Sequence, residues 1–310
     1  MNKLIFICLF SFTFLFPAST NNYNSIFYYA KSPKTNSLNG IHFLSENVSE
    51  IFYQPISKES VIKNDYYFSF SNQYDDQLKI FQFAYCINHN EYKNSSIGFI
   101  NRIVDDIYNT SSAWNQYEFL IPEFNNIDYD QISVLDYKDY GFVFSYNRYL
   151  EKINLCLKIK PSYNSFDSDR AFGLDIDLLS YYKLADSGID FIIGLNNLIS
   201  YKRWNNNDIE KNEIEYFLSS NIKLNKINIF LQVDNIYNEK IAIEYDIKNS
   251  FYIRFGRDNN NYYTSGFGVF SNIIDVNYAY SNHNILGNNH QISLMFKMES
   301  IKYLDDKIDL

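Results

Sequence analysis

Residues 153–160 read Ile-Asn-Leu-Cys-Leu-Lys-Ile-Lys, and an apolar side chain occupies every second position from Ile153 to Ile159. Successive side chains of a β-strand point to opposite faces of the sheet, so this pattern gives one face that is wholly apolar. The opposite face carries the charges of Lys158 and Lys160. The stretch therefore predicts a strand with an apolar side and a polar, charged side.

The same alternation recurs along the chain, for example in 171–179, 227–234 and 290–298, and no helical period is sustained beyond the N-terminus. The strands that we predict from it are 66–72, 78–87, 95–103, 140–149, 152–160, 171–181, 188–197, 214–223, 227–234, 240–246, 250–257, 264–270, 273–280 and 290–298. An open sheet of about fourteen strands would leave long edges exposed, and closure into a barrel removes them.

Charged residues lie opposite the apolar faces of these strands. They are Lys158, Asp175, Asp177, Asp190, Asp234 and Arg254. Charges that faced the core of a β-sandwich would carry a large desolvation cost, whereas a wet barrel lumen accepts them. The pattern therefore predicts an all-β fold, a transmembrane antiparallel β-barrel of about 14 strands with these six charges in its lumen. The alternative is a secreted β-sandwich or repeat protein, whose strands also alternate.

Connection lengths support the barrel. The long connections 104–139, 161–170, 198–213 and 281–289 fall at one end of the predicted strands, and most connections at the other end are short. Long outer loops and short periplasmic turns are typical of outer-membrane barrels, although a few connections at the first end are short as well.

The composition narrows the classes of function. Of 310 residues, 46% are hydrophobic and 19% aromatic, which is enough apolar content for a folded core and excludes disorder as the main state. The net charge of −9 without a cluster of Lys and Arg argues against nucleic acid as a partner. Mean hydropathy is −0.31, and no apolar run long enough for a membrane helix follows the N-terminus.

The first residues, Met1 to Thr20, have one lysine, an apolar stretch and then small residues, as in a secretory signal peptide. We therefore divide the chain into a signal peptide at 1–20, a plug or periplasmic segment at 21–65, a barrel at 66–298 and an acidic tail at 299–310. The location that this predicts is the outer membrane of a Gram-negative bacterium, with membrane lipid around a monomeric barrel.

The sequence offers no constellation for catalysis. Its four histidines are scattered, and it has no nucleophile elbow, metalloprotease helix or phosphate loop. We therefore expect no enzymatic activity, no catalytic residue, no cofactor and no metal site. Two cysteines remain in the predicted mature chain, Cys86 and Cys156, and a disulfide between them is neither required nor excluded.

Four stretches, read in order, resemble the PorV/PorQ family of outer-membrane proteins, which belongs with the FadL-like barrels. They are Asn39 to Pro55, Ala171 to Leu198, Ile253 to Gly256, and the pair Val276 to Tyr280 with Leu286 to Leu294. The last pair, an Asn-Tyr-Ala segment followed by Leu-Gly-Asn-Asn-His-Gln-Ile-Ser, is the most specific. In the first stretch Gln54-Pro55-Ile56 stands where the family has Asn-Pro-Ala.

The resemblance implies a role in type IX protein secretion, in which such a barrel binds secreted cargo and hands it on. The partners that it implies are secretion translocon subunits and secreted cargo proteins. The candidate cargo-contact residues are Trp114, Tyr117 and Phe119, in the long connection 104–139. Two alternatives stay open: a FadL-like channel for apolar small molecules, and a structural or adhesive surface barrel.

Overall fold

The computed structural model describes residues 25–45, 47–56, 65–74, 77–90, 92–113, 128–184, 187–235, 238–248, 250–283 and 287–297. Its strands are β1 (Tyr66–Gln73), β2 (Leu78–His89), β3 (Lys93–Asn109), β4 (Ser133–Leu150), β5 (Ile153–Phe166), β6 (Asp169–Leu184), β7 (Ile189–Trp204), β8 (Ile209–Glu210), β9 (Glu215–Leu224), β10 (Ile227–Asp234), β11 (Glu239–Asp246), β12 (Phe251–Asp258), β13 (Tyr263–Phe270), β14 (Ile274–His283) and β15 (Gly287–Phe296).

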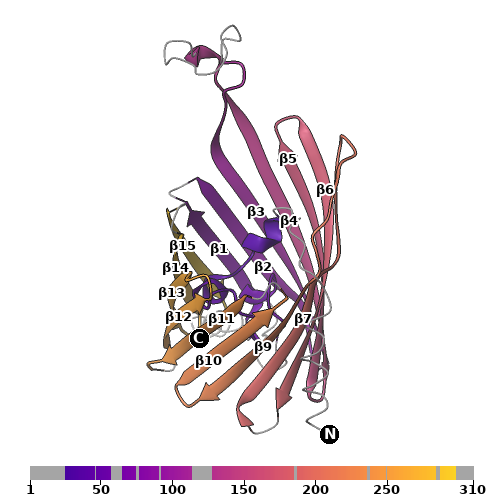
Figure 1. Ribbon diagram of the computed structural model, residues 1–310. Coiled ribbons are helices and arrows are strands. Elements are labelled where there is room, and N and C mark those ends of the chain that lie inside the picture. The colour runs from indigo at the N-terminus through magenta and orange to yellow at the C-terminus, as the bar shows by residue number, and fades with distance from the viewer. Residues whose placement is uncertain are drawn as a thin grey trace, which may run out of the picture.

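The strands close into a ring. Each strand pairs with its neighbours in antiparallel register. The neighbour of β7 is β9, and the two-residue β8 pairs only with the end of β7. The ring is completed by β1 and β15, in which Tyr66 lies opposite Phe296 and Gln73 opposite Asn289. Within the described residues this is a closed antiparallel barrel of 14 strands, and the fold predicted from the alternation is confirmed (Figure 1).

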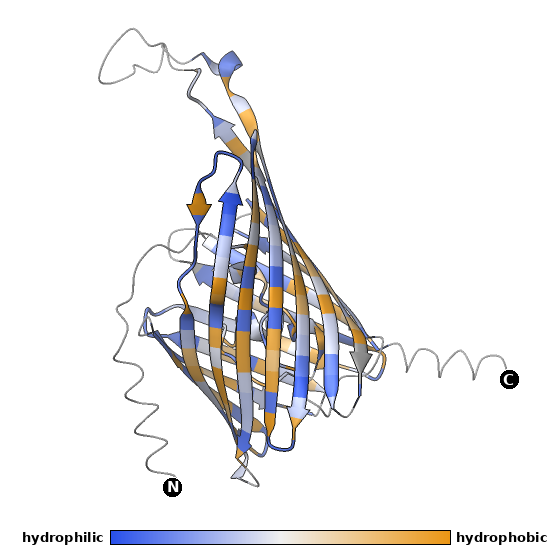
Figure 2. Ribbon diagram, turned by 90° about the vertical axis from the view of Figure 1, so that its right-hand side faces the viewer, coloured by the Kyte–Doolittle hydropathy of each residue, from blue (hydrophilic) through white to orange (hydrophobic). Residues whose placement is uncertain are grey.

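The barrel has an apolar outside and a polar inside. Along β5, Leu155, Leu157 and Ile159 are 39%, 38% and 39% exposed. Lys158, which lies between Leu157 and Ile159, is fully buried. Figure 2 shows hydrophobic residues recurring along the outer wall of the strands. A water-soluble protein buries apolar side chains and exposes charges, so the reversed arrangement is that of a barrel surrounded by lipid.

The barrel is taller on one side. Strands β3 to β7 have 14 to 18 residues, and β9 to β15 have 8 to 10, apart from the two-residue β8 that precedes them. We call the end where β1 begins and β15 ends the proximal end, and the opposite one the distal end. At the distal end β3 and β4 continue as a two-stranded ribbon as far as the pair Asn109 and Ser133, beyond the last partner of β2 at Val104 (Figure 1).

Several connections predicted as long loops are largely strand. Connection 161–170 is reduced to a turn at 167–168, and 104–139 loses residues at both ends to β3 and β4. The alternation of apolar and polar residues ends where a strand leaves the lipid, because neither face then needs to be apolar. The backbone ladder continues beyond that point, so the sequence pattern underestimates the strand lengths.

The N-terminal segment 25–56 lies inside the barrel as a plug. It contains the short helices η1 (Ile26–Tyr29), α2 (Pro33–Ser37) and η2 (Val48–Glu50), with Ser25 and Ser32 as side-chain caps of the first two. A further short helix, η4 (Tyr129–Gln131), lies at the β3–β4 ribbon. None of the helices in the described residues is long and apolar enough to cross a membrane.

The plug packs where the inner wall lacks side chains. A Cβ at Gly98 would lie 2.6 Å from the ring of Phe52, and one at Gly141 would lie 2.7 Å from the ring of Phe27. The two phenylalanines belong to a buried apolar cluster formed jointly by the plug and strands β1 to β4. Glycine in these strands therefore allows aromatic plug residues to contact the wall closely.

Candidate functional site: the plugged lumen

The six charged residues predicted to face the lumen are all on the inner face. Lys158, Asp175 and Arg254 are fully buried, and Asp177, Asp190 and Asp234 are at most 5% exposed. The structure distributes them over two regions of the wall, one on β5 to β7 and one on β10 to β12. They do not form a single cluster.

On the inner face β5 carries two cations, Lys158 and Lys160, and the neighbouring β6 carries two anions, Asp175 and Asp177. Lys160 Nζ lies 2.7 Å from Asp177 Oδ2, and Asp175 accepts a hydrogen bond of 3.2 Å from the hydroxyl of Ser25. Lys158 Nζ has no hydrogen-bond partner among the described residues. This side of the lumen therefore contacts the beginning of the plug.

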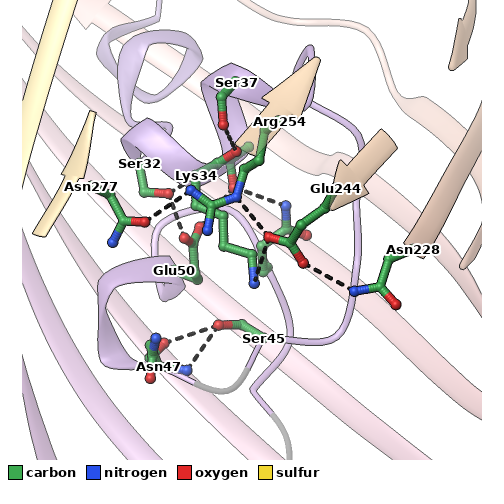
Figure 3. A network of polar contacts seen from close by, with 12 residues as sticks. Ser32, Lys34, Ser37, Ser45, Asn47, Glu50, Asn228, Glu244, Arg254 and Asn277 are labelled. Carbon is green, nitrogen blue, oxygen red and sulfur yellow. Dashed lines mark hydrogen bonds and ion pairs between the residues drawn. The ribbon is translucent and has the colours of Figure 1, made fainter. Parts of the chain in front are cut away.

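The second region holds the plug through a buried ion network. Glu244 accepts hydrogen bonds from Arg254 Nε at 2.6 Å and from Asn228 Nδ2 at 3.0 Å. Arg254 also donates from Nη1 to Asn277 at 2.9 Å, and Lys34 of the plug lies 3.9 Å from Glu244 (Figure 3). One carboxylate thus joins β11, β12 and helix α2, because it is shared by two cations.

A second carboxylate stabilises the plug internally. Glu50 is 2% exposed and accepts hydrogen bonds from the hydroxyls of Ser32 and Thr35. Gln54 donates to Thr35 Oγ1 and to the backbone oxygen of Ile41. The plug is therefore an ordered unit that keeps its shape through its own polar contacts, and it is also bonded to the wall.

His42 fixes the middle of the plug against β9 and β10. Its ring is stacked between Tyr53 and Phe217, with centroid distances of 4.1 and 3.7 Å, and its Nδ1 lies 3.0 Å from Gln232 Oε1. Gln232 Oε1 also accepts from Ser219 Oγ, so it acts as an acceptor and the Nδ1 of His42 is the donor. Burial lowers the pKa of His42 well below its usual range, since the imidazolium form would be desolvated.

A pocket of about 330 Å³ lies at the distal end, between the plug and strands β11 to β15 and β1. Plug residues Tyr28, Lys31 and Asn39 line one side of it, and Lys240 and Asn238 are on the wall. Tyr28 is 70% exposed, although it belongs to the plug. The plug and the wall thus build this pocket together.

The candidate cargo-contact residues Trp114, Tyr117 and Phe119 lie outside the described residues. The predicted signal peptide and the acidic tail from 299 lie outside them as well. Cys86 and Cys156 are buried thiols, and no disulfide joins them. Across the described ranges no three His, Cys, Asp or Glu side chains are arranged to hold a metal ion.

Sequence reasoning missed the residues that connect plug to wall. Lys31, Lys34 and His42 lie in a segment without periodicity, so no sequence pattern indicates their partners. Glu244 and Lys240 occupy inward positions of a predicted strand, and the alternation that selected Arg254 could have found them. Arg102 and Asp139, which form a buried ion pair of 2.5 Å, were missed because Asp139 fell in a predicted loop.

Comparisons with known proteins identify the fold. No model of a known protein family matches the chain, and no curated protein matches it. Among solved structures, a deletion mutant of the TodX monoaromatic hydrocarbon channel matches with a TM-score of 0.54 at 8% identity, covering 86% of this chain and 97% of that one. A Pseudomonas aeruginosa FadL homologue gives a TM-score of 0.48 at 8% identity over 86% and 98%, and Acinetobacter baumannii Omp33 one of 0.42 at 9% over 76% and 98%.

At such low identity the likeness to TodX is one of fold. The narrower resemblance to the PorV/PorQ family stays a prediction. Together with the apolar outer wall and the polar lumen, the comparison shows that this chain has the fold of an outer-membrane β-barrel.

Proposed function

We propose that this chain is a FadL-like outer-membrane channel, in which the plug 25–56 controls the passage of small organic molecules through the lumen. The observation that carries the proposal is the way the plug is held. It packs on strands β1 to β4 through an apolar cluster, and it is also bonded to the wall by polar contacts, among them Lys34 with Glu244 and His42 with Gln232. Polar contacts can be exchanged for water when part of a plug moves, whereas a wholly apolar interface would resist that movement.

The likeness in fold to a monoaromatic hydrocarbon channel supports the same reading. It makes an apolar molecule such as toluene a reasonable first solute. In this proposal the distal end faces outward, because the β3–β4 ribbon extends from that end and outer-membrane barrels have their longer loops on the outside.

The test compares the full chain with a variant that lacks residues 25–56, each reconstituted into liposomes. We expect the full chain to admit selected small solutes slowly, and the deletion variant to conduct ions and sugars without selection. Gel mobility before and after heating controls for folding, since a closed barrel resists detergent until it is heated. Two folded preparations that are both impermeable to every solute would exclude a channel.

The β3–β4 ribbon favours a second candidate, the capture of secreted cargo. The ribbon extends beyond the strands that flank it, as far as Asn109 and Ser133, and it carries the predicted contact residues between these ends. Deletion of 106–136 should abolish cargo capture if this candidate is right. Unchanged cargo capture by the folded deletion variant would exclude this candidate function.

A further inference from the structure

We infer that the distal pocket is a binding site for a small hydroxylated organic acid, of the class of the acidic sugars. The inference deepens the proposed function by naming a polar class of solute in addition to the apolar one, and it rests on that function for the route by which the ligand leaves the pocket. It depends on three properties of the pocket: unpaired cations, unsatisfied amide groups and an exposed aromatic ring.

The cations of the pocket differ from most of the others in the lumen. Five inward-facing cations elsewhere lie within 4.0 Å of a carboxylate, namely Lys34, Arg102, Lys160, Lys202 and Arg254, and the fully buried Lys158 is an exception. Lys31 and Lys240, which line the pocket, have no such partner in the described part of the chain. Two ammonium groups without a carboxylate favour a ligand that brings its own negative charge.

Two side-chain amides of the pocket have polar atoms that a hydroxyl group of a ligand could satisfy. Asn39 is 7% exposed, and its Nδ2 donor has no hydrogen-bond partner among the described residues. The Oδ1 acceptor of Asn238 is also unsatisfied there. Buried polar groups are nearly always hydrogen-bonded, so a donor and an acceptor left over in one pocket fit a ligand that can both accept and donate. A hydroxyl group does both.

The aromatic ring fits a ring-shaped ligand. Tyr28 stands exposed at the pocket, and Lys31 Nζ lies 4.5 Å from the centroid of its ring. A ligand whose carboxylate meets Lys31 therefore has a flat apolar surface beside it. A sugar ring has an apolar C–H face that can pack on tyrosine while its edge forms hydrogen bonds.

One carboxylate also lines the pocket. Asp258 Oδ1 accepts hydrogen bonds from the backbone N–H groups of Asn260 and Tyr262, at 3.0 and 2.9 Å. These bonds engage it in the β12–β13 turn. Among the residues that line the pocket the two lysines outnumber this carboxylate, and the carboxylates of Glu215 and Asp234 act on Lys240 from outside the lining.

The experiment measures binding to the full folded chain in detergent by isothermal titration calorimetry. The probes are galacturonate, the neutral sugar galactose, and benzoate, which has a carboxylate but no hydroxyl group. The variants are Lys31→Gln and Lys240→Gln. The matched control is Lys226→Gln, which removes an exposed lysine in the proximal β9–β10 turn.

We expect galacturonate to bind at least about tenfold more tightly than galactose or benzoate, which corresponds to the loss of roughly one charged contact. Each pocket variant should weaken galacturonate binding by about tenfold, and Lys226→Gln should leave it unchanged. Equal binding of benzoate and galacturonate, or binding that neither pocket variant weakens, would overturn the inference. So would the absence of saturable galacturonate binding.

Liposome permeability in the same preparations separates this inference from the proposed function. Permeability to toluene or other solutes without galacturonate binding would support the channel and exclude acidic sugars as the ligand class. Galacturonate binding in a barrel that passes no solute would support the pocket as a binding site and exclude the channel function.

Discussion

Lys34 of the plug and Glu244 of β11 lie 3.9 Å apart, and Glu244 is at the same time the partner of Arg254 at 2.6 Å. The connection between plug and wall therefore shares its carboxylate with a structural ion pair inside the wall. Arg254 is fully buried, so its charge depends on this carboxylate. Removing the shared carboxylate and removing only the plug cation should therefore affect different properties of the barrel.

Glu244→Gln should destabilise the barrel by about 3–5 kcal/mol, because it leaves the buried guanidinium without a counter-charge. The measurement is the temperature at which the fast-migrating folded band is lost on a gel. Lys34→Gln is the matched comparison: it should lower this temperature much less and raise solute permeability. Equal thermal loss in both variants would mean that Arg254 does not depend on Glu244.

Gly98→Ala should displace the plug, since the new Cβ would lie 2.6 Å from the ring of Phe52 and 3.1 Å from the side chain of Ile51. We expect higher conductance in planar bilayers, with a barrel that still folds. The double variant Gly98→Ala with Phe52→Leu supplies the control, because the smaller side chain provides room and should restore the low conductance. Failure of this rescue would contradict a direct contact.

Acid should loosen the plug through His42. The pKa of His42 is lowered in the docked plug, and a free histidine has a pKa of about 6.5. The undocked plug therefore binds more protons, and the docking energy is complete above pH 6.5 and falls by up to about 1.4 kcal/mol per pH unit below it. Protection factors of the plug amides, which are exchange rates corrected for the pH dependence of intrinsic exchange, would show this between pH 5 and 8, with a fall of up to about tenfold per unit below pH 6.5.

The variant His42→Phe separates the titration of His42 from other effects of low pH on the barrel. It keeps a ring between Tyr53 and Phe217 but removes the titrating group. The variant should dock somewhat more weakly at neutral pH, since the hydrogen bond to Gln232 is lost, and the protection factors of its plug amides should no longer respond to acid in this range. An unchanged pH response would assign the effect to another group.

The outer face of β5 should tolerate an apolar substitution but not a charge. Leu157→Lys should destabilise the membrane-inserted barrel by about 2–4 kcal/mol, because it places a charge against lipid. Leu157→Phe at the same site should be nearly neutral. Urea unfolding of the barrel in lipid vesicles measures both, and a barrel indifferent to Leu157→Lys would argue against lipid contact at this face.

The barrel could be predicted because lipid imposes a strict rule on its strands. Every second residue must be apolar within the membrane, and this alternation is visible in β5 and β6 without any knowledge of their partners. The ends of β3 and β4 could not be found in the same way, since they lie beyond the region where the rule applies. Their pairing, such as Tyr108 with Val134, depends on a neighbouring strand and leaves no periodic trace.

The site was less accessible than the fold. Inward charges such as Lys158 and Arg254 followed from the alternation, but their partners did not. Lys34 meets Glu244 only because the plug folds back into the lumen, and residues so distant in sequence have no local pattern that joins them. The distal pocket combines both problems, because Lys31 comes from the plug and Lys240 from the wall.

The pairing of β1 with β15 bears on the order of folding. The ring closes only when the last strand, which ends at Phe296, meets the first one at Tyr66. Contacts between such distant residues are slow to form. Segment 25–56 precedes every strand of the barrel, so it is present when closure begins, and we expect the wall to assemble around Phe27 and Phe52 as a template. A chain without this segment should therefore reach the heat-modifiable state more slowly, even though it retains every strand.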